Sequence, residues 1–398
     1  MYFKRFGFMG FLYMSKTNWQ TKKLGEILKL EYGKPLPKNI RSNNGKYPVY
    51  GANGIKNFSD QFYYDKFSII VGRKGSAGEI NLTKEKFWPL DVTYFVTFDN
   101  KKYDLKFLYN LLDTLKLPKL AKGVKPGINR NEVYSIEVKT PTLSEQHRII
   151  KKLDKVFGEI EKAKESTERN LQNSKDLFES YLQNIFEKSN DEWQEKKLGD
   201  KNLLQIIDGD RGKNYPKKSD FLKEGYCLFL NTKNVRPNGF DFKTTMFITK
   251  KKDDALGNGK LQRNDVLLTT RGTIGNIAVY GEDVPFKNIR INSGMLIFRP
   301  NTKLITPGYL YTIFQSGIMK FQIKKYVSGA AQPQLPIKTL VNFSIPVLKS
   351  LSEQKSIVKK LDELSEKTKR LEEIYKQKLA DLEELKKSIL KQAFEGKL

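Results

Sequence analysis

The stretch Leu143-Ser144-Glu145-Gln146-His147-Arg148-Ile149-Ile150-Lys151-Lys152-Leu153-Asp154 occurs twice in this chain. Its second copy is Leu351-Ser352-Glu353-Gln354-Lys355-Ser356-Ile357-Val358-Lys359-Lys360-Leu361-Asp362, 208 residues further on, with ten of the twelve positions identical or nearly so. Upstream, Trp19-Gln20-Thr21-Lys22-Lys23-Leu24-Gly25-Glu26 matches Trp193-Gln194-Glu195-Lys196-Lys197-Leu198-Gly199-Asp200. Such a repeat unit is far longer than the roughly 20–50 residues of a solenoid repeat. The chain therefore contains two copies of a whole module, each a globular part followed by a helical part.

Both copies of the first stretch open a long helix. Apolar or small residues recur in steps of three and four, which is the seam of a coiled coil. We expect Ser144 and Ser352 to be the N-caps, and Gly158 is the one weak point inside either helix. Each helix of about 44 residues would be about 66 Å long at ~1.5 Å per residue. We expect the two helices to pair antiparallel and to hold the globular parts apart. The expected seam residues are Ile149, Leu153, Val156, Ile160, Ala163, Thr167, Leu171, Ser174, Leu177, Tyr181 and Ile185, then Ile357, Leu361, Leu364, Thr368, Leu371, Tyr375, Leu382, Leu385 and Ile389.

The two globular parts read as mixed α/β domains with a mainly β core. Short apolar or alternating runs predict strands, and helical spacing predicts one helix in each part, at residues 105–117 and 307–326. The predicted fold class is α+β, with a pseudo-two-fold internal repeat. The predicted strands lie at residues 67–71, 93–98, 265–269, 276–280 and 295–298. The predicted domains are residues 15–142 and 191–350, and the predicted helical segments are residues 143–190 and 351–398.

Local features of the two globular parts also align. Gly72-Arg73-Lys74-Gly75 corresponds to Thr270-Arg271-Gly272-Thr273, and residues 123–126 correspond to residues 329–333. The intervals between the repeated stretches nevertheless differ by 34 residues. We therefore expect two similar but unequal domains.

Composition points to a polyanionic partner. The formal net charge is +27, and nucleic acid is the commonest partner of such a chain. The alternative is a lysine-rich proteome in which the charge only solvates the surface. The single Cys227 and single His147 exclude a disulfide framework and a Cys/His zinc cluster. They fit a reducing, cytoplasmic setting.

No catalytic motif stands out. The chain has no phosphate-binding loop, no G-x-G-x-x-G after a strand, no G-x-S-x-G elbow and no Asn-Pro-Pro-aromatic tetrapeptide. We expect His147 to be a surface residue and Cys227 to be a buried apolar residue. No cofactor or metal is predicted. The apolar residues 1–14 are too short to span a bilayer, and we interpret them as a leader or an upstream start, with Met14 as the candidate initiator.

Because no catalytic motif is found, the candidate functional residues are those that could bind nucleic acid. Arg can contact guanine, Asn and Gln can contact adenine, and Lys neutralises phosphate. Loops that combine these residues with Gly and aromatic residues are the best candidates, although a Gly-flanked Asn such as Asn53 or Asn292 can simply complete a turn. The candidate DNA-binding residues are Tyr50, Asn53, Arg73, Lys74, Lys122, Lys125, Asn129, Arg130, Arg211, Lys213, Asn214, Arg271, Asn292, Gln332 and Gln334.

Taken together, these segments resemble the specificity subunit of a type I restriction–modification system. The Leu-Ser-Glu-Gln helix starts, preceded by Pro141 and Pro346, resemble the repeated conserved regions of that family. The Trp-Gln-x-Lys-Lys-Leu-Gly segments resemble the openings of its target-recognition domains. The segment Tyr47-Pro48-Val49-Tyr50-Gly51-Ala52-Asn53-Gly54-Ile55 is similar to one that recurs in those domains, as is Gly72-Arg73-Lys74-Gly75. The resemblance covers residues 15–398, and the order domain, helix, domain, helix is its specific part.

The resemblance implies a non-catalytic subunit that binds double-stranded DNA. Each target-recognition domain would read one half of a bipartite, asymmetric sequence. The helices would set the spacer and bind two methyltransferase subunits, and restriction/translocase subunits would join that complex. No membrane is involved in this interpretation.

Three alternatives stay open at this stage. The chain could serve another class of restriction system, such as one with a fused methyltransferase–nuclease. It could be a coiled-coil scaffold that does not recognise DNA. It could also be a DNA-modifying enzyme whose active site has no recognisable motif.

Overall fold

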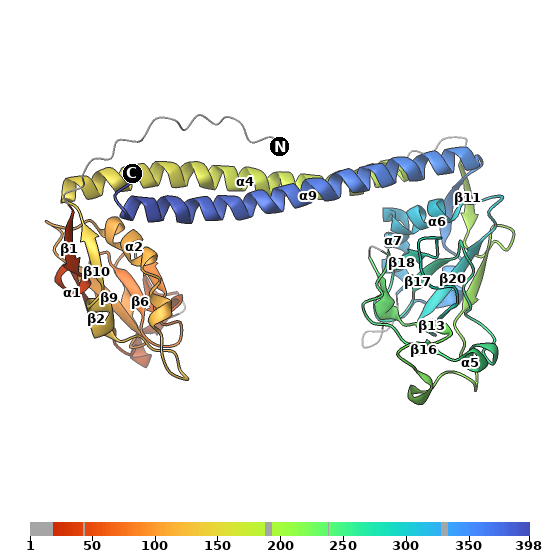
Figure 1. The fold of residues 1–398 in the computed structure, drawn as a ribbon, viewed down its shortest axis with the longest axis horizontal. Coiled ribbons are helices and arrows are strands. Elements are labelled where there is room, and N and C mark those ends of the chain that lie inside the picture. The colour runs from red at the N-terminus through yellow and green to blue at the C-terminus, as the bar shows by residue number, and fades with distance from the viewer. Residues whose placement is uncertain (1–18, 43, 188–192, 238, 328–332) are drawn as a thin grey trace. The chain divides into compact units, whose positions relative to one another are not determined.

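A computed structural model of the chain describes residues 19–42, 44–187, 193–237, 239–327 and 333–398. Residues 1–14 and Gln332 therefore lie outside the described residues. The chain divides into two units. The first contains the residues up to Glu168 together with Gln377–Leu398, and the second is Arg169–Lys376. Each unit combines one globular part with one end of each long helix (Figure 1).

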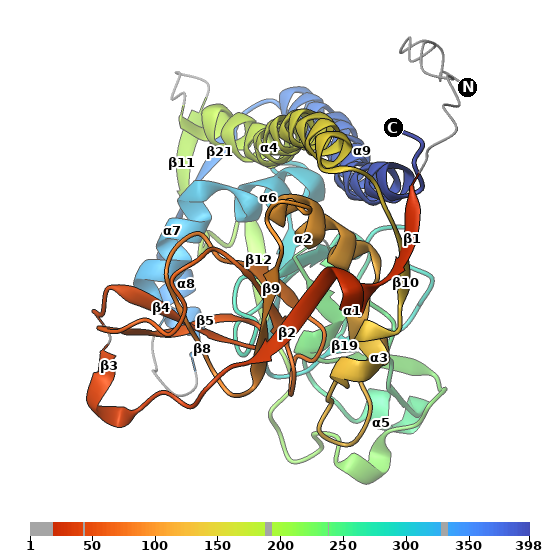
Figure 2. The same ribbon diagram turned by 90° about the vertical axis from the view of Figure 1, so that its left-hand side faces the viewer.

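The first unit is built on two four-stranded sheets. One has the strand order β2-β9-β6-β7 and is antiparallel throughout, and the other has the order β3-β5-β4-β8. A third pair, β1-β10, joins the start of the unit to the strand that leads into α4 (Figure 2). The elements are β1 (Gln20–Lys23), α1 (Leu24–Ile27), β2 (Leu28–Tyr32), η1 (Lys38–Ile40), β3 (Arg41–Ser42), β4 (Tyr47–Gly51), β5 (Gly54–Ser59), β6 (Ile69–Gly72), β7 (Ile80–Leu82), β8 (Trp88–Pro89), β9 (Thr93–Phe98), α2 (Leu105–Thr114), η2 (Leu117–Leu120), α3 (Arg130–Tyr134) and β10 (Glu137–Thr140).

The second unit repeats this plan. The sheet β12-β20-β17-β18 corresponds to β2-β9-β6-β7, and the pair β11-β21 corresponds to β1-β10. A parallel pair also recurs, as β4 with β8 and as β13 with β19. The elements are β11 (Trp193–Lys197), β12 (Leu204–Asp208), η3 (Lys218–Asp220), β13 (Cys227–Leu230), η4 (Thr232–Asn234), β14 (Val235–Arg236), β15 (Gly239–Phe240), β16 (Phe247–Ile248), α5 (Lys250–Asp254), β17 (Val266–Thr269), β18 (Ile277–Val279), β19 (Ile289–Ile291), β20 (Met295–Pro300), α6 (Pro307–Gln315), α7 (Gly317–Tyr326), α8 (Ile337–Leu340) and β21 (Ser344–Leu348).

Each main sheet packs one face against a helix. In the first unit the apolar side of α2, with Phe107 and Leu111, joins the core that β6 and β9 provide. In the second unit Tyr309 and Ile313 of α6 pack on β17 and β20 in the same way. The strands β6 and β17 are buried along their whole length, as expected for central strands. The predicted fold class, α+β with an internal repeat, is confirmed.

One predicted helix is interrupted. The segment predicted as a helix over residues 307–326 forms α6 and α7, with a break at Ser316. Ser316 has an extended backbone, and its hydroxyl donates to the carbonyl of Ile313 at 2.6 Å. A serine side chain that satisfies the last carbonyls of a helix favours termination there. The break allows both short helices to bury apolar residues in one core.

The long helices are α4 (Leu143–Glu187) and α9 (Leu351–Phe394). In the first unit they run antiparallel, because Arg148 Nη2 donates to the carbonyl of Leu398 at 2.8 Å and Lys164 Nζ lies 3.0 Å from Glu383 Oε1. In the second unit, Leu182 of α4 and Leu361 of α9 enter the same core. The expected antiparallel pairing is thus seen in the first unit.

Two details of the helix prediction are wrong. The helices begin at Leu143 and Leu351, so Ser144 and Ser352 lie in the first turn and are not N-caps. Ser350 takes that role in α9, where its hydroxyl accepts from the amide of Glu353 at 3.3 Å.

The predicted seam also fails at several positions. Leu177 and Tyr181 are 49 % and 38 % exposed, while Leu182 and Phe186 are buried in the second core. Here α4 packs against the globular part of the second unit, which covers a different face of the helix from the one that a two-helix seam would bury. Leu371 and Leu385 of α9 are exposed as well.

None of the helices among the described residues combines the length and the apolar character needed to cross a membrane.

Candidate nucleic-acid interface

Two loops of the first unit are paired through their backbones. One follows β6 at residues 73–79, and the other leads from η2 to α3 at residues 121–129. Lys74 and Gly127 form an antiparallel bridge between the two loops. The pairing brings together segments that are about 50 residues apart in the sequence. The predicted residues in these two loops are Arg73, Lys74, Lys122, Lys125 and Asn129.

The second unit has the same arrangement. Arg271, in the loop after β17, forms an antiparallel bridge with Gln334, in the segment before α8. Beside it, the amide of Leu335 donates to the carbonyl of Thr270 at 3.0 Å. Arg271 and Gln334 are both predicted residues and are both exposed. The two units therefore each present a cationic side chain at one paired-loop site.

The structure corrects the register between these loops. Lys74 and Arg271 occupy the same place, since each forms the bridge to the second loop of its own unit. The glycines that follow them, Gly75 and Gly272, have φ of +79° and +70°, a conformation that glycine adopts without strain. The predicted pairing of Arg73 with Arg271 is thus wrong by one residue. The equivalent loops share a Lys or Arg followed directly by a left-handed glycine.

An exposed tyrosine that sequence reasoning missed lies beside two predicted arginines. Tyr32, the last residue of β2, is 49 % exposed. The guanidinium carbons of Arg73 and Arg130 lie 5.4 Å and 5.0 Å from its ring centroid, within cation–π range. Tyr94 packs edge-on against Tyr32, and burial raises the pKa of Tyr94 to about 12. No motif marks Tyr32, because only the pairing of β2 with β9 brings it to this place.

Arg73 is also held by the backbone. Its Nε and Nη2 donate to the carbonyl of Asp91 at 3.0 Å and 2.6 Å. A guanidinium has five N–H donors, so others remain for a ligand. The geometry presents an aromatic ring and two cations together, which suits contact with phosphates or base edges.

Other predicted residues of the first unit are placed differently. Asn53 is exposed in the turn between β4 and β5. Tyr50 is only 7 % exposed and packs edge-on against Phe87, with ring centroids 5.8 Å apart. Its side chain lies in an aromatic core, and burial raises its pKa. The structure therefore gives Tyr50 a packing role.

The second loop of the first unit contains a structural asparagine and two exposed lysines. The side chain of Asn129 caps α3 by accepting from the amide of Asn131 at 2.8 Å. Lys122 Nζ lies 2.6 Å from Glu132 Oε1, in an exposed pair that contributes little to stability. Lys125 is exposed at the tip of the loop.

In the second unit, Arg211 and Asn292 lie close together, since both contact the backbone of residues 293–294. Arg211 Nη2 donates to the Ser293 carbonyl at 3.2 Å and pairs with Asp208 at 3.1 Å. The Asn292 side chain accepts from the amide of Gly294 at 3.0 Å, which is the turn-completing role that the sequence left open.

Lys213 and Asn214 lie on a neighbouring loop. Both are exposed, and Asn214 Nδ2 donates to the carbonyl of Ala255 at 2.9 Å. That contact ties the loop of residues 209–214 to the segment that follows α5. The loop that carries Arg211, Lys213 and Asn214 therefore lies beside the segment after α5. Among the described residues, the first unit has no helix that corresponds to α5.

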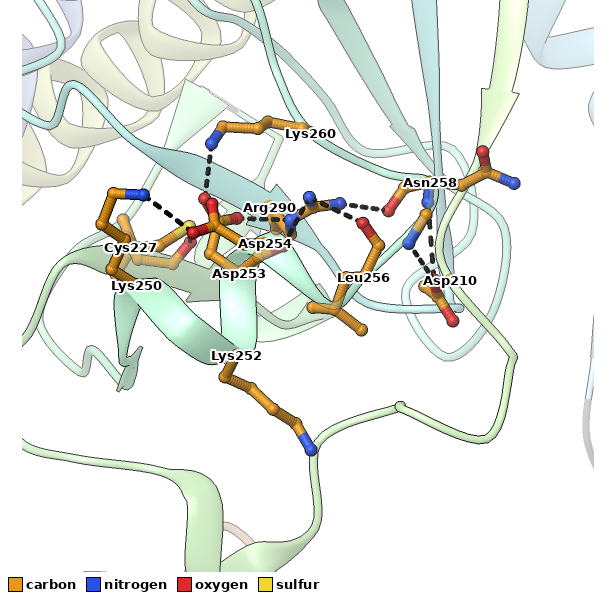
Figure 3. Close-up of polar contacts among 12 residues, drawn as sticks. Asp210, Cys227, Lys250, Lys252, Asp253, Asp254, Leu256, Asn258, Lys260 and Arg290 are labelled. Atoms are coloured by element: carbon orange, nitrogen blue, oxygen red, sulfur yellow. Dashed lines mark hydrogen bonds and ion pairs between the residues drawn. The ribbon is translucent and has the colours of Figure 1, made fainter.

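A buried charge network holds α5 and the segment that follows it (Figure 3). Asp253 is fully buried and pairs with Arg290, which is itself 5 % exposed, and with Lys260. Arg290 also donates to the carbonyls of Leu256 and Asn258, at 3.0 Å and 2.7 Å. Burial opposes ionisation of Asp253, but the hydrogen bonds from Lys260 and Arg290 outweigh it and hold its pKa below the usual range.

Asp210 links the network to the predicted loop. Its carboxylate accepts from the amides of Gly212 and Gly257, each at 2.7 Å, and from that of Asn258 at 3.4 Å. Burial opposes ionisation here as well, yet these amides lower the pKa of Asp210. Sequence reasoning missed Asp210, Asp253 and Arg290, because none belongs to a motif. The contacts that join them to the rest of the network, Asp253 with Arg290 and Asp210 with Gly257, span 37 and 47 residues of sequence.

Groups with catalytic potential are not gathered at these loops. Burial raises the pKa of Cys227 to about 12, and the residue is fully buried as predicted. The His147 side chain is 60 % exposed and lies 3.6 Å from Asp104. Within the described ranges, no three His, Cys, Asp or Glu side chains are arranged to hold a metal ion.

Comparison with known proteins identifies similarity along most of the chain. Residues 16–168 and 190–383 each match the family described as the type I restriction modification DNA specificity domain. The chain is 25 % identical to the type I restriction enzyme EcoBI specificity subunit of Escherichia coli, over 75 % of this chain. That alignment spans 66 % of the EcoBI subunit, slightly less than two thirds of its length. The MjaVIII specificity subunit of Methanocaldococcus jannaschii is 26 % identical, over 96 % of this chain and 93 % of its own.

Solved structures share the fold. A chain from a structural study of complex assembly and conformational transition in the type I R-M system has a TM-score of 0.71 and 20 % identity, covering 96 % of this chain and 98 % of that one. The HsdS subunit from Thermoanaerobacter tengcongensis has a TM-score of 0.61 and 19 % identity, covering 97 % of this chain and 99 % of its own. At such identities the likeness concerns the fold alone.

Proposed function

Because the chain belongs to the family of type I restriction–modification DNA specificity proteins, we propose that it is the sequence-specific DNA-binding subunit of a type I restriction–modification complex. Its two domains, residues 15–142 and 191–350, each read one half of a bipartite target. Its helical segments, residues 143–190 and 351–398, bridge two methyltransferase subunits. Restriction/translocase subunits join this complex, and the chain itself performs no chemical step.

The observation that carries this proposal is the duplicated paired-loop site. Lys74 and Arg271 occupy equivalent places in the two units, each followed by a left-handed glycine. Absence of a Cβ next to a cationic side chain lets a DNA backbone approach closely. A lysine or arginine there can bind a phosphate or the O6 and N7 atoms of guanine. Two such sites in one chain fit a target with two half-sites.

The unequal surroundings of the two sites support an asymmetric target. In the first unit the residue before Lys74, Arg73, lies over the ring of Tyr32. In the second unit the neighbouring loop carries Arg211, and Asp210 of that loop is bonded to the segment that follows α5. Different side chains around an equivalent cation would read different bases, so the target would not be palindromic.

Exposed apolar residues on the long helices support the docking of methyltransferase subunits. Leu177 and Ile374 are 49 % and 52 % exposed, both within the second unit. In the same unit a groove of about 1300 Å³ is lined by α4, α6 and α9, with Phe178, Tyr311 and Asp362 among its walls. Apolar side chains left in water on a polar helix favour a protein partner.

Sequencing of methylated bases tests the function. Cells that carry the chain with its neighbouring methyltransferase should show a gapped, asymmetric methylated motif, which disappears when the chain is deleted. Lys74→Ala should relax or weaken only one half of the motif, and Arg271→Ala only the other. A lost bidentate contact costs about 1–3 kcal/mol of discrimination, or roughly 5- to 150-fold.

Matched control variants separate site effects from loss of surface charge. Lys84 and Lys303 are exposed and follow the far ends of β7 and β20, away from the paired loops. Their replacement by alanine should leave both half-sites intact. If the wild-type chain changed no methylation while the methyltransferase was expressed, the DNA-reading proposal would fail and a scaffold role would be favoured.

A further inference from the structure

The long helices are polar at their surfaces, yet each buries one glutamine completely near its start. Gln146 in α4 and Gln354 in α9 are both 0 % exposed. They are the fourth residues of the two Leu-Ser-Glu-Gln repeats. A buried amide is costly unless its donors and acceptor are satisfied, so its recurrence at the same place calls for a physical reason.

In the first unit, Gln146 connects three segments. Its Oε1 accepts from the backbone amide of Asp104 at 2.9 Å. Its Nε2 donates to the carbonyls of Lys102 and Pro141, at 3.0 Å and 3.1 Å. Asp104 is the N-cap of α2, and Pro141 follows β10. One side chain thus joins α4 to the start of α2 and to the strand that leads into α4.

In the second unit, Gln354 makes the same set of contacts. Its Oε1 accepts from the backbone amide of Thr306 at 2.8 Å. Its Nε2 donates to the carbonyls of Leu304 and Leu348, each at 2.9 Å. Thr306 is the N-cap of α6, and Leu348 ends β21. The same three-way connection therefore exists in two domains that differ in their other contacts.

Other links between helix and domain are less directional. Lys106 Nζ lies 2.8 Å from Asp154 Oδ2, but both side chains are more than half exposed, so this pair contributes little. At the corresponding position of α6 stands Gly308, which cannot form such a pair. His147 of α4 lies 3.6 Å from Asp104, and Lys320 of α7 lies 2.9 Å from Glu179 of α4, but His147, Lys320 and Glu179 are all more than half exposed. Apolar packing between helix and domain has no preferred direction. Three hydrogen bonds with good geometry restrict rotation and sliding much more strongly.

We propose that Gln146 and Gln354 are positioning residues that fix the angle at which each recognition domain leaves its long helix, and that they thereby restrict the spacer length of the DNA target. This inference rests on the proposed function. A domain held at one angle would reach bases at one distance along the duplex. A domain released from the glutamine would pivot and accept half-sites that are one base pair closer or further away.

The test uses the full chain assembled with its methyltransferase subunits. Duplexes carry the wild-type half-sites, taken from the methylated motif, with the spacer at its natural length or changed by one base pair. For Gln146→Met and Gln354→Met, which keep the side-chain volume, the preference for the natural spacer should fall about tenfold, equivalent to about 1.4 kcal/mol. Discrimination against altered half-site bases should stay as in the wild type.

Gln172→Ala is the matched control. Gln172 lies exposed on α4, where its amide donates to Asp176 on the same helix. This variant should keep the natural spacer preference. An unchanged preference in both methionine variants, with assembled complexes, would contradict the proposal and leave the glutamines as purely structural residues.

Hydrogen exchange provides a second measurement that needs no variant. In the wild-type complex, the amides of Asp104 and Thr306 should exchange faster on a duplex with an altered spacer than on the natural one, because the strained complex would open these bonds. Equal rates on both duplexes would refute the inference even if the variants failed to fold. Failure of the proposed function is recognised separately, since the wild-type complex would then show no gapped motif.

Discussion

At the scale of single residues, the sequence predicts which charged side chains lie in the loops, but it does not predict how the loops of the two units align. Lysines and arginines beside glycines were identified from sequence, and Lys74 and Arg271 stand at equivalent loop positions. The register between them was wrong, because two loops of similar composition can be aligned in more than one way. The left-handed glycines settle it, since only the folded backbone shows which residue has a positive φ.

Tyr50 illustrates the opposite error. An aromatic residue in a Gly- and Asn-rich segment suggested a surface for bases, yet it packs against Phe87 in an aromatic core. The segment is a strand, and alternate residues of a strand face opposite sides. Tyr32, which ends another strand, has the exposed ring instead.

The buried pair of Asp253 and Arg290 leads to a prediction. Replacement Asp253→Asn leaves Arg290 buried without its countercharge, which typically costs about 3–5 kcal/mol. We expect amides of β13 and α5 to lose protection in hydrogen exchange. Asp254→Asn is the matched control, because Asp254 forms an exposed pair with Lys250 and its loss should cost less than about 1 kcal/mol.

The pH dependence of this variant follows from the sign of the shift. The pKa of Asp253 is lowered in the folded protein, so its carboxylate stabilises the fold fully above its ordinary pKa of 3.8. That contribution is lost as the pH falls below 3.8 toward the folded-state pKa. The difference between wild type and Asp253→Asn should therefore be constant near neutrality and shrink in acid. A difference that grows in acid would contradict this assignment.

At the scale of elements, the long helices show where local periodicity is sufficient. Steps of three and four in apolar residues identified both helices. The seam within them was only partly identified, because α4 faces α9 along one part and the second globular core along another, where Leu182 and Phe186 are buried. Periodicity shows that a helix has an apolar face, but the face that is covered depends on which element lies beside each turn.

Replacement of Gly158, inside α4, tests how far local helix propensity stabilises this element. A Cβ at Gly158 would meet no atom within 4 Å, so Gly158→Ala adds only helix propensity. We expect it to stabilise the helix by about 0.5–1 kcal/mol, measured as a higher urea midpoint of the helical circular dichroism signal.

Gly275→Ala is the contrasting variant. A Cβ there also has space, with its nearest neighbour at 3.8 Å, but φ is +93°. This substitution should destabilise the second unit, since alanine is strained at such a φ. If both variants shifted stability in the same direction, the backbone argument would be wrong.

At the scale of the whole molecule, the repeat explains the order of the elements. Each unit has a strand pair, a main sheet, a covering helix and one long helix start, in the same sequence order. A chain with two such copies presents two sites of related geometry and different detail. The continuous helices α4 and α9 are the parts that a spacing function would use.

Lengthening both helices tests that use. Four residues inserted after Glu168 and four after Lys376 fall at the boundary between the units, so contacts inside each unit are kept. Each helix gains about 6 Å at ~1.5 Å per residue. The spacer of the methylated motif should lengthen by one or two base pairs, at ~3.4 Å each. A spacer of unchanged length, with normal half-sites, would show that the helices do not set the distance.

The sequence by itself determined the internal repeat, the two long helices, the strands β6, β9, β17, β18 and β20, and the basic character of the loops. These features depend on local periodicity and on residue type, which act over a few neighbours along the chain. The fold class followed from their order.

Only the tertiary structure decided which of these residues meet. Tyr32 comes beside Arg73 and Arg130, and Gln146 comes beside Asp104, through strand pairing and helix packing across distant segments. A buried glutamine looks like any other polar residue in a sequence, because its partners are backbone groups that carry no residue-specific signal. The physical reason is that hydrogen bonds and burial are set by positions in space, and long-range pairing alone creates those positions.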